Sequence, residues 1–325
     1  MQPERFVLVF IISVVCTYLS RIIALKFKIL DAPNSLKIHK SSQPRFGGFG
    51  IFAALCAGII MLPSSYHWVL AGAIVMWLVG VIDDRWTIGS FQKLAGQCLA
   101  AAILGYSLFG LGPSWVGLTY GVLGFLLAVV FANAVNLIDG MDGLAGGNSF
   151  LIFVGLGLME LFHGGDWHVS FVTATAILGF LPFNFPRAKL FMGDSGSLVI
   201  GYFIAYTLVM LLIASPTLFV CGLIISIVPT FDLTLGVIRR LVNGKPIFAA
   251  DRGHFYDRLN ESTHNARITV LITYACTVTF NIVAIALSFT SLAVAASGLL
   301  LVAVLLLLIS RSMGWLQTEA ELGRI

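Results

Sequence analysis

Charged side chains are scarce in this sequence. They make up 10% of its 325 residues, whereas an ordinary soluble domain carries about 25%. Apolar residues account for 58%, and the mean hydropathy is +0.97. A soluble fold of this length needs a charged surface that this composition does not provide. The composition therefore excludes a soluble enzyme and a disordered protein.

Signals of a disulfide framework or a zinc site are also lacking. The five Cys residues all lie in apolar stretches, and no CxxC spacing occurs. There is no HExxH motif, no Walker loop, no GxGxxG and no Ser–His–Asp order. We expect the Cys residues to behave as small apolar side chains.

Long apolar segments recur instead, too often to be buried in one soluble core. A transmembrane helix needs roughly 20 mostly apolar residues. We predict an all-α, polytopic membrane protein whose single domain spans residues 1–325, with about eleven transmembrane helices and ten as the alternative. Lys26 and Lys28 follow the first segment rather than precede it, which favours a retained helix over a signal peptide. The spans are expected near 5–25, 46–62, 67–82, 94–110, 115–135, 149–162, 168–184, 197–214, 217–238, 268–289 and 291–310.

Positive charge divides the predicted loops into two sets. Arg5 alone of the 19 Lys and Arg residues lies near one set, and the others lie on or at the edge of the second. Cytoplasmic loops carry an excess of Lys and Arg. We therefore place the N-terminus outside and the C-terminus in the cytoplasm. The net charge of +4 reflects this topology, and we expect no nucleic-acid partner.

Acidic residues concentrate on the same cytoplasmic side. Apart from Glu4, Glu160, Asp166 and Asp232, the 15 acidic residues lie on or near it. Asp232 falls within a predicted helix, where an ionisable group is costly and is therefore a functional candidate.

Two adjacent carboxylates, Asp83 and Asp84, follow the third predicted span. Such neighbours raise each other's proton affinity or are held charged by a cation, which suits a general base or a metal site. Lys93 begins the next span, either as an anchor at the membrane surface or as a counter-charge for phosphate.

The most informative stretch runs from Asn136 to Gly147. Asp139 and Asp142 are three residues apart, so a helical turn would place both on one face. Four glycines in this stretch would let the backbone approach a ligand closely.

Two further cytoplasmic segments carry polar groups. Asp194 lies in Gly-Asp-Ser-Gly-Ser, where the serines could cap a helix or the Asp could bind Mg²⁺ beside a substrate phosphate. The loop 239–267 mixes Asp, Arg and His, which suits either a basic surface or a multi-anionic ligand. Together with the membrane setting, these groups favour magnesium-assisted phosphoryl transfer to a lipid.

The cytoplasmic motifs resemble those of the polyprenyl-phosphate N-acetylhexosamine-1-phosphate transferases. The matching segments are Asp31-x-Pro-Asn with His39, Pro44-Arg-Phe-Gly-Gly48, Asp83-Asp84 with Lys93, Asn136-x-x-Asp139-Gly-x-Asp142-Gly-Leu, Asn184 with Phe191-Met-Gly-Asp194-x-Gly-Ser197, and Pro229-x-x-Asp232 with Asp251-Arg-x-His254.

The resemblance implies a reaction and its participants. A UDP-N-acetyl sugar would donate its sugar-1-phosphate to undecaprenyl or another polyprenyl phosphate and release UMP, with Mg²⁺ or alternatively Mn²⁺ as cofactor. The setting would be the bacterial inner membrane, at the first membrane step of cell-envelope glycan synthesis. The sequence does not decide between a monomer and a homodimer, or between direct attack by the lipid phosphate and a covalent Asp intermediate.

The resemblance also implies residue roles. Asp194 would bind the metal, Asp83 and Asp84 would lie near the lipid phosphate with one as a base, and His254 would complete the catalytic set. The expected substrate contacts are Lys93 with phosphate, Phe191 with uracil, Asn184 and Asp142 with the uridine part, Asn136 and Asp139 in the metal loop, and Arg252 and Arg258 near the pyrophosphate or sugar.

One departure concerns the sugar. Many members that use UDP-GlcNAc carry several His residues where this chain has His254-Phe-Tyr-Asp-Arg258. We expect UDP-GlcNAc or a related 6-deoxy sugar. Two alternatives are a CDP-alcohol phosphotransferase, whose D-x-x-D-G start is present without the rest of its motif, and a transporter or flippase, which would place polar groups near the bilayer midplane.

Overall fold

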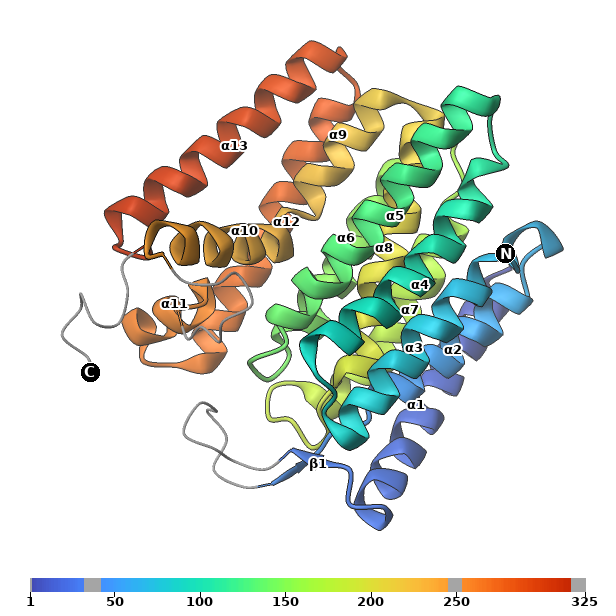
Figure 1. The fold of residues 1–325 in the computed structure, drawn as a ribbon, viewed down its shortest axis with the longest axis vertical. Helices are drawn as coiled ribbons and strands as arrows, with labels where there is room; N and C mark the ends of the chain where they lie inside the picture. The colour runs from blue at the N-terminus through green and yellow to red at the C-terminus, as the bar shows by residue number, and fades with distance from the viewer. Residues whose placement is uncertain (1, 32–41, 245–252, 317–325) are drawn as a thin grey trace.

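The computed structural model describes residues 2–31, 42–244 and 253–316, and helices dominate them (Figure 1). The all-α prediction is confirmed, with a two-stranded antiparallel sheet of β1 (Leu30–Asp31) and β2 (Gln43–Pro44) as the small exception. A 3₁₀ turn covers Ser64–Tyr66. The α-helices are α1 (Pro3–Lys26), α2 (Gly48–Ile60), α3 (Val69–Trp86), α4 (Ser90–Phe109), α5 (Ser114–Leu137), α6 (Leu144–Phe162), α7 (His168–Asn184), α8 (Asp194–Ala214), α9 (Pro216–Ile225), α10 (Ile227–Val242), α11 (Phe255–Thr263), α12 (Ala266–Ser288) and α13 (Leu292–Ser312).

Helix length and apolar composition identify a multi-pass membrane protein. Among the described residues, six helices are long and apolar enough to cross a bilayer, or seven if α9 and α10 together form one span. The six are α1, α5, α6, α8, α12 and α13, while α2 and α7 are shorter apolar helices. Each predicted span coincides with a helix or with this pair. The count of eleven and the orientation stay predictions.

Helix α8 forms the centre of the bundle, with every residue from Asp194 to Val209 buried. It packs against α5 and α3. A Cβ on Gly80 of α3 would lie 2.4 Å from the Ser195 nitrogen, so glycine permits the close approach of these helices. The end of α3 is thereby pressed against the first turn of α8, where the candidate site forms.

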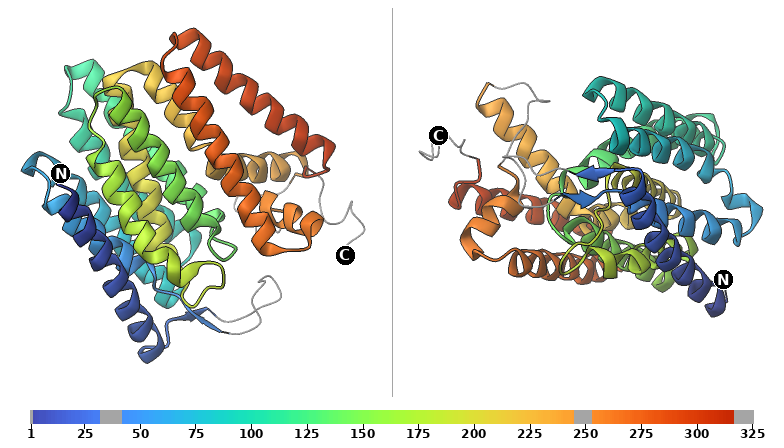
Figure 2. Two further views of the ribbon diagram at one scale, coloured as in Figure 1. Left: turned by 180° about the vertical axis from the view of Figure 1, so that it is seen from behind. Right: turned by 90° about the horizontal axis from the view of Figure 1, so that it is seen from below.

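The predicted span over 217–238 is not one continuous helix. It is broken at Ser226 into α9 and α10, which meet at an angle of 71°. Helix α10 lies crosswise to its neighbours, whereas α1 and α13 stand at opposite edges of the bundle (Figures 1 and 2). Asp232, Arg239 and Arg240 are buried on one face of α10. Charged groups are costly in hydrocarbon, so α10 is poorly suited to be the second half of a continuous membrane span.

Two local expectations also change. Asp83 and Asp84 lie on the last turn of α3, not after it, since the helix continues to Trp86 and ends at Thr87 with φ of 48°. Asp139 and Asp142 do not share a helical turn, because residues 138–143 form a loop that ends at Gly143 with φ of 78°.

Candidate active site

Asp194, the first residue of α8, lies at the centre of a charged cluster. Its Oδ1 accepts a hydrogen bond from Asn136 Nδ2 at 3.0 Å. Lys93 Nζ contacts Oδ2, and the Arg45 guanidinium contacts Oδ1. Asp194 is 1% exposed, so three donors from α4, α5 and the segment after β2 converge on a carboxylate shielded from bulk water.

Asp84 caps the first turn of α8 from the end of α3. Its Oδ1 accepts from the Asp194 backbone N–H at 2.8 Å, and its Oδ2 accepts from that of Ser195 at 3.0 Å. Arg45 Nε lies 3.1 Å from Oδ1. The first N–H groups of a helix have no partner within the helix, and a carboxylate there also matches the helix dipole. Asp84 therefore links α3, α8 and Arg45.

Asp83 points away from Asp84 although the two are adjacent. Its Oδ1 accepts from the Ile88 backbone N–H at 2.9 Å, and its Oδ2 lies 3.4 Å from Lys93 Nζ. Lys93 is thus shared by Asp83 and Asp194 and also reaches Asn136 Oδ1 at 3.2 Å. The predicted residues Asp83, Lys93, Asn136 and Asp194 do come together.

Arg45 was not selected from the sequence as a site residue, although its Pro-Arg-Phe-Gly-Gly segment is part of the resemblance. A parallel bridge joins it to Phe191, with the Phe191 N–H donating to the Pro44 carbonyl at 2.8 Å. This backbone pairing holds both Arg45 and Phe191 next to the Gly193–Asp194 turn. Only the fold reveals the contact, because Arg45 and Asp194 are 149 residues apart in the chain.

Asn184 and Asp142 tie two loops to each other. Asn184 Oδ1 accepts from the Gly143 N–H at 3.0 Å, and its Nδ2 donates to the Leu190 carbonyl at 3.1 Å. Asp142 Oδ2 accepts from the Ala188 N–H at 2.8 Å. These bonds fix the loop after α5 against the loop that carries Phe191, and the expected contact with uridine stays a prediction.

Asp139 lies on the inner side of the loop after α5. Burial raises the pKa of Asp139 to about 8, and the neighbouring Arg45 partly offsets this effect. Asp84 and Asp31 act in the same direction as burial because like charges disfavour ionisation. A cation bound close to Asp139 would therefore favour the ionised form of its carboxyl group.

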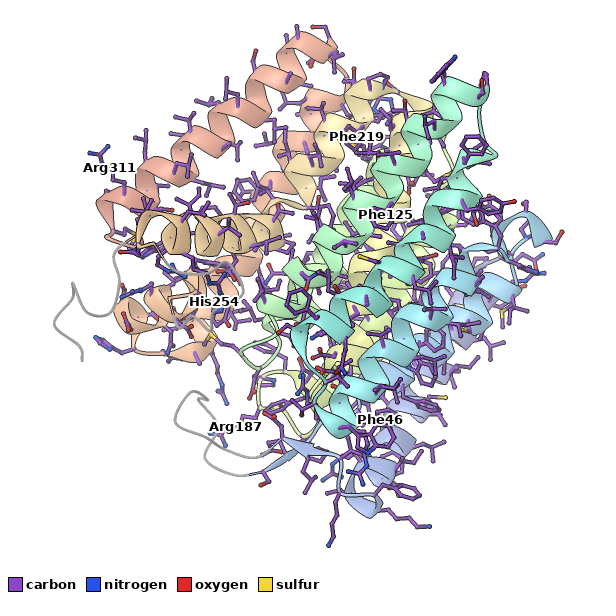
Figure 3. The ribbon with its side chains drawn as sticks, viewed as in Figure 1. Phe46, Phe125, Arg187, Phe219, His254 and Arg311 are labelled. Carbon is purple, nitrogen blue, oxygen red and sulfur yellow. The ribbon has the colours of Figure 1, made fainter. Side chains whose placement is uncertain are left out.

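His254 belongs to a second cluster, which lies beside α10 (Figure 3). Its Nδ1 lies 2.7 Å from Asp232 Oδ2, and the Phe255 N–H donates to Asp232 Oδ1 at 2.9 Å. The Tyr256 ring stacks on His254 at 5.3 Å between centroids, and its hydroxyl donates to the Leu137 carbonyl at 3.2 Å. Tyr256 therefore joins this cluster to the loop of Asp139.

The remaining predicted contacts are placed only in part. Arg258 is buried on α11, in the second cluster. Arg252 lies outside the described residues. Asp232, singled out as an ionisable group in a helix, is explained by its contact with His254, whereas Tyr256 had no sequence signal beyond its position two residues later.

The charge balance of the first cluster fits a divalent cation. Five carboxyl groups gather there against two cations, Arg45 and Lys93, and the raised pKa of Asp139 means that an added cation would favour its ionised form. The described part of the chain has no group of three His, Cys, Asp or Glu side chains arranged to hold a metal alone. Mg²⁺ often binds through one or two carboxylates and substrate phosphates, so this donor set is adequate for it. The carboxylates are Asp31, Asp83, Asp84, Asp139 and Asp194.

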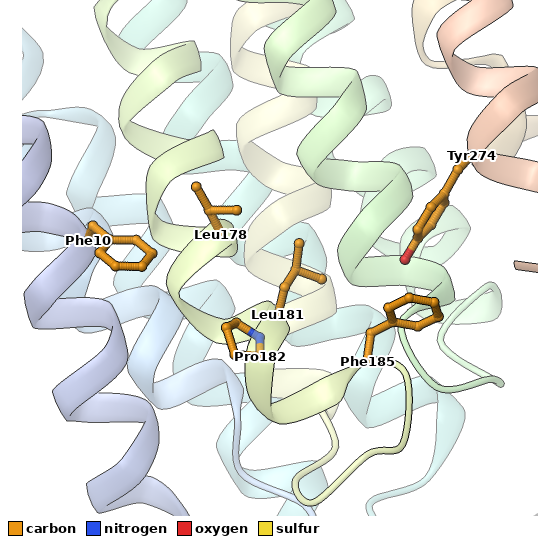
Figure 4. Close-up of a pocket in the computed structure, with 6 residues that line it drawn as sticks. All are labelled: Phe10, Leu178, Leu181, Pro182, Phe185 and Tyr274. Carbon is orange, nitrogen blue, oxygen red and sulfur yellow. The ribbon is translucent and has the colours of Figure 1, made fainter. Parts of the chain in front are cut away.

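An apolar cavity of about 330 Å³ lies on the other side of the loop after α5 (Figure 4). Phe10 lines one side of it, and Phe185 and Tyr274 line the other. The Tyr274 hydroxyl donates to the Gly143 carbonyl at 2.6 Å and so links α12 to the loop after α5. The lining is apolar and does not match a nucleotide.

Comparison with known proteins identifies the class. Residues 66–212 match the family described as Glycosyl transferase family 4. The chain is 35% identical to the probable undecaprenyl-phosphate N-acetylglucosaminyl 1-phosphate transferase of Bacillus subtilis (strain 168), over 87% of this chain and 85% of that protein. It is 31% identical to decaprenyl-phosphate N-acetylglucosaminephosphotransferase of Mycobacterium tuberculosis (strain ATCC 25618 / H37Rv), over 83% and 80%. It is 30% identical to undecaprenyl-phosphate alpha-N-acetylglucosaminyl 1-phosphate transferase of Yersinia pestis, over 84% and 81%.

The chain belongs to glycosyl transferase family 4 and is a membrane-embedded transferase of the phospho-sugar type. The family predicted from the motifs is confirmed. This assignment decides against the CDP-alcohol phosphotransferase and the transporter.

Proposed function

We propose that this protein transfers N-acetylglucosamine-1-phosphate from UDP-GlcNAc to a polyprenyl phosphate, which releases UMP and begins a lipid-linked glycan. The names of the relatives specify this sugar and this type of acceptor. The observation that carries the proposal is the convergence of Lys93, Arg45 and Asn136 on Asp194. That arrangement combines positive charge for phosphates with a carboxylate for a cation.

The reaction exchanges one phosphoanhydride partner for another. An oxygen of the lipid phosphate attacks the phosphorus that bears the sugar, and the bond from that phosphorus to the UMP oxygen breaks. Lys93 and Arg45 can stabilise the negative charge on the phosphates as this bond changes. Of the two adjacent acids, Asp83 is the better candidate for a base, since both oxygens of Asp84 accept backbone N–H groups of α8.

Asp194 would hold Mg²⁺, or Mn²⁺ in its place, with Asp139 close by. When bound, the ion supplies charge neutralisation of the pyrophosphate and of the departing UMP. The carboxylate surplus around Arg45 and Lys93 supports this assignment.

The loops carrying Phe191 and Asp142 would bind the nucleotide. Phe191 is half-buried next to Arg45 and would stack on uracil. Asn184 and Asp142 would act by holding both loops in register. His254 and Arg258 would contact the sugar or the pyrophosphate from the second cluster, and Arg252, which lies outside the described residues, is expected to contact the same groups. We propose that the protein lies in the bacterial plasma membrane. Whether it forms a homodimer can be tested by measuring its mass in detergent.

The test is a panel of UDP-N-acetylhexosamine donors offered to purified protein with undecaprenyl phosphate and Mg²⁺. We expect UMP and a lipid-linked sugar from UDP-GlcNAc, and the panel includes UDP-GalNAc and a UDP-6-deoxy-N-acetylhexosamine. Turnover of the 6-deoxy donor alone would change the proposed sugar donor but support the same reaction. No product from any donor would contradict the proposal.

A further inference from the structure

Helix α13 is the last helix of the described residues, and its end reaches the cluster of His254. Along Leu292–Ser312, which the structure describes throughout, only Ala295 and Ser310 are buried. The chain then reverses direction, and Trp315 is 7% exposed. A helix that presents nearly all of its length outward thus ends on a buried aromatic residue.

A Schellman motif produces the reversal. The Trp315 N–H donates to the Ser310 carbonyl at 2.9 Å, and the Gly314 N–H donates to the Arg311 carbonyl at 3.2 Å. Gly314 has a φ of 69°, a conformation that glycine adopts at little cost. The motif satisfies the last carbonyls of α13 and folds Trp315 back toward α10.

Trp315 joins an aromatic cluster with one residue from α10 and one from α11. Its ring centroid is 6.4 Å from that of Phe231 and 6.4 Å from that of Phe255. Phe231 and Phe255 are 5.8 Å apart. Aromatic pairs at these separations attract each other, so Trp315 holds the start of α11 against α10.

The Trp315 backbone forms a second link to the same region. Arg239 Nη1 donates to the Trp315 carbonyl at 3.1 Å. The guanidinium also lies close to Gly253, where an added Cβ would be 2.7 Å from the Arg239 Cζ. Trp315 therefore contacts Phe255, the residue after His254, directly. It is linked to Gly253, the residue before His254, through Arg239.

We propose that Trp315 is a positioning residue that orients His254 through Phe255 and Arg239. This inference rests on the proposed function, in which His254 contacts the substrate. The Asp232 carboxylate holds His254 Nδ1 from α10, while Trp315 keeps α11 and α10 at the spacing that this bond requires. A small misplacement of a catalytic group can cost about 100-fold in rate, so a residue remote from the substrate can set turnover.

The experiment measures UMP release by full-length wild-type, Trp315→Ala and Trp315→Phe proteins. We expect Trp315→Ala to lower kcat at least tenfold, with the KM for UDP-GlcNAc changed less than threefold. Trp315→Phe keeps an aromatic ring and should recover kcat to within threefold of wild type. Trp115→Ala is the matched control, because Trp115 is exposed at the start of α5, and it should leave kcat unchanged.

A double mutant separates positioning from general destabilisation. If Trp315 acts through His254, Trp315→Ala should lower kcat less than twofold in a His254→Ala background. Equal losses in both backgrounds, or a Trp315→Ala enzyme within twofold of wild type, would overturn the inference. Should Trp315→Ala fail to fold, Trp315→Leu retains apolar volume without the ring and is expected to lose kcat at least threefold, and full activity would overturn it. An inactive wild type would contradict the proposed function instead.

Discussion

Asp84 and Asp194 come from different helices, and the carboxylate of the first caps the backbone of the second. Asp84 Oδ1 accepts the Asp194 N–H at 2.8 Å. The side chain of Asp194 is thereby directed toward Lys93 and Arg45 instead of being used to cap its own helix. Asp84 therefore positions Asp194, and Asp194 is the acid that we propose for binding the cation.

Replacement of Asp194 by Asn should abolish turnover and leave the protein folded. The side chain keeps its size, but it loses the charge that would bind Mg²⁺ and pair with Lys93. Loss of such an electrostatic group costs on the order of 10³-fold in rate. The measurement is UMP release, with folding checked by the melting temperature in detergent. Asp166→Asn is the control, since Asp166 pairs with His168 at the end of α7 opposite to Asn184. Appreciable activity in Asp194→Asn would refute the metal role.

Gly193 and Gly164 can be compared to test the site turn. Both have positive φ, 74° and 67°, and Gly193 also has ψ of 176°, a combination that is essentially restricted to glycine. A Cβ on Gly193 would lie 2.6 Å from an Asp84 carboxylate oxygen, whereas nothing lies within 4 Å of one on Gly164. Gly164→Ala should cost only the backbone strain of roughly 1–2 kcal/mol. Gly193→Ala should lower the melting temperature further and remove activity. Equal effects of the two substitutions would show that the contact with Asp84 is unimportant.

Stability should fall as the pH rises between about 4 and about 8. The pKa of Asp139 is raised to about 8 in the folded protein, mainly by burial, so folding favours the protonated acid. The unfolded chain ionises near its ordinary pKa and is favoured increasingly across this range. Melting temperatures at pH 5 and pH 8, in EDTA, should therefore differ in the wild type and differ less in Asp139→Asn. An unchanged pH dependence in the variant would assign the effect to another group. Added Mg²⁺ should reduce the difference, because a nearby cation favours the carboxylate.

The predicted topology can be tested by labelling single Cys residues in a background without the five native ones. Ser65 lies after α2 on the side predicted to be external, and Arg187 lies after α7 on the side predicted to be cytoplasmic, and both are exposed. In intact cells a membrane-impermeant thiol reagent should label Ser65→Cys and not Arg187→Cys. Permeabilised cells should label both. The reverse pattern would invert the orientation.

The helical class and most of the first cluster could be predicted from the sequence. Asp83, Lys93, Asn136 and Asp194 stand next to apolar spans of recognisable length, and loops on one side of a membrane are confined to one surface. Arg45 could not be selected in the same way. Its partners are distant in the chain, and a lone Arg in a loop carries no local sign of what it contacts.

The break at Ser226 was missed for a different reason. The segment 217–238 is apolar enough to form one span, and Pro229, which lies in the first turn of α10, was not interpreted as the start of a helix. The contact between Asp232 and His254, which are 22 residues apart, is not visible in the hydropathy pattern either. Hydropathy reports how a segment partitions between water and lipid, not what its side chains meet.

The sequence by itself determined that this chain is a helical membrane protein of a particular transferase family, because composition and motif order are local properties. Tertiary structure decided which acid serves which purpose. Asp83 and Asp84 are neighbours of the same type, but one turns toward Lys93 and the other caps α8. That difference arises from the packing of α3 against α8 at Gly80, which no single segment encodes.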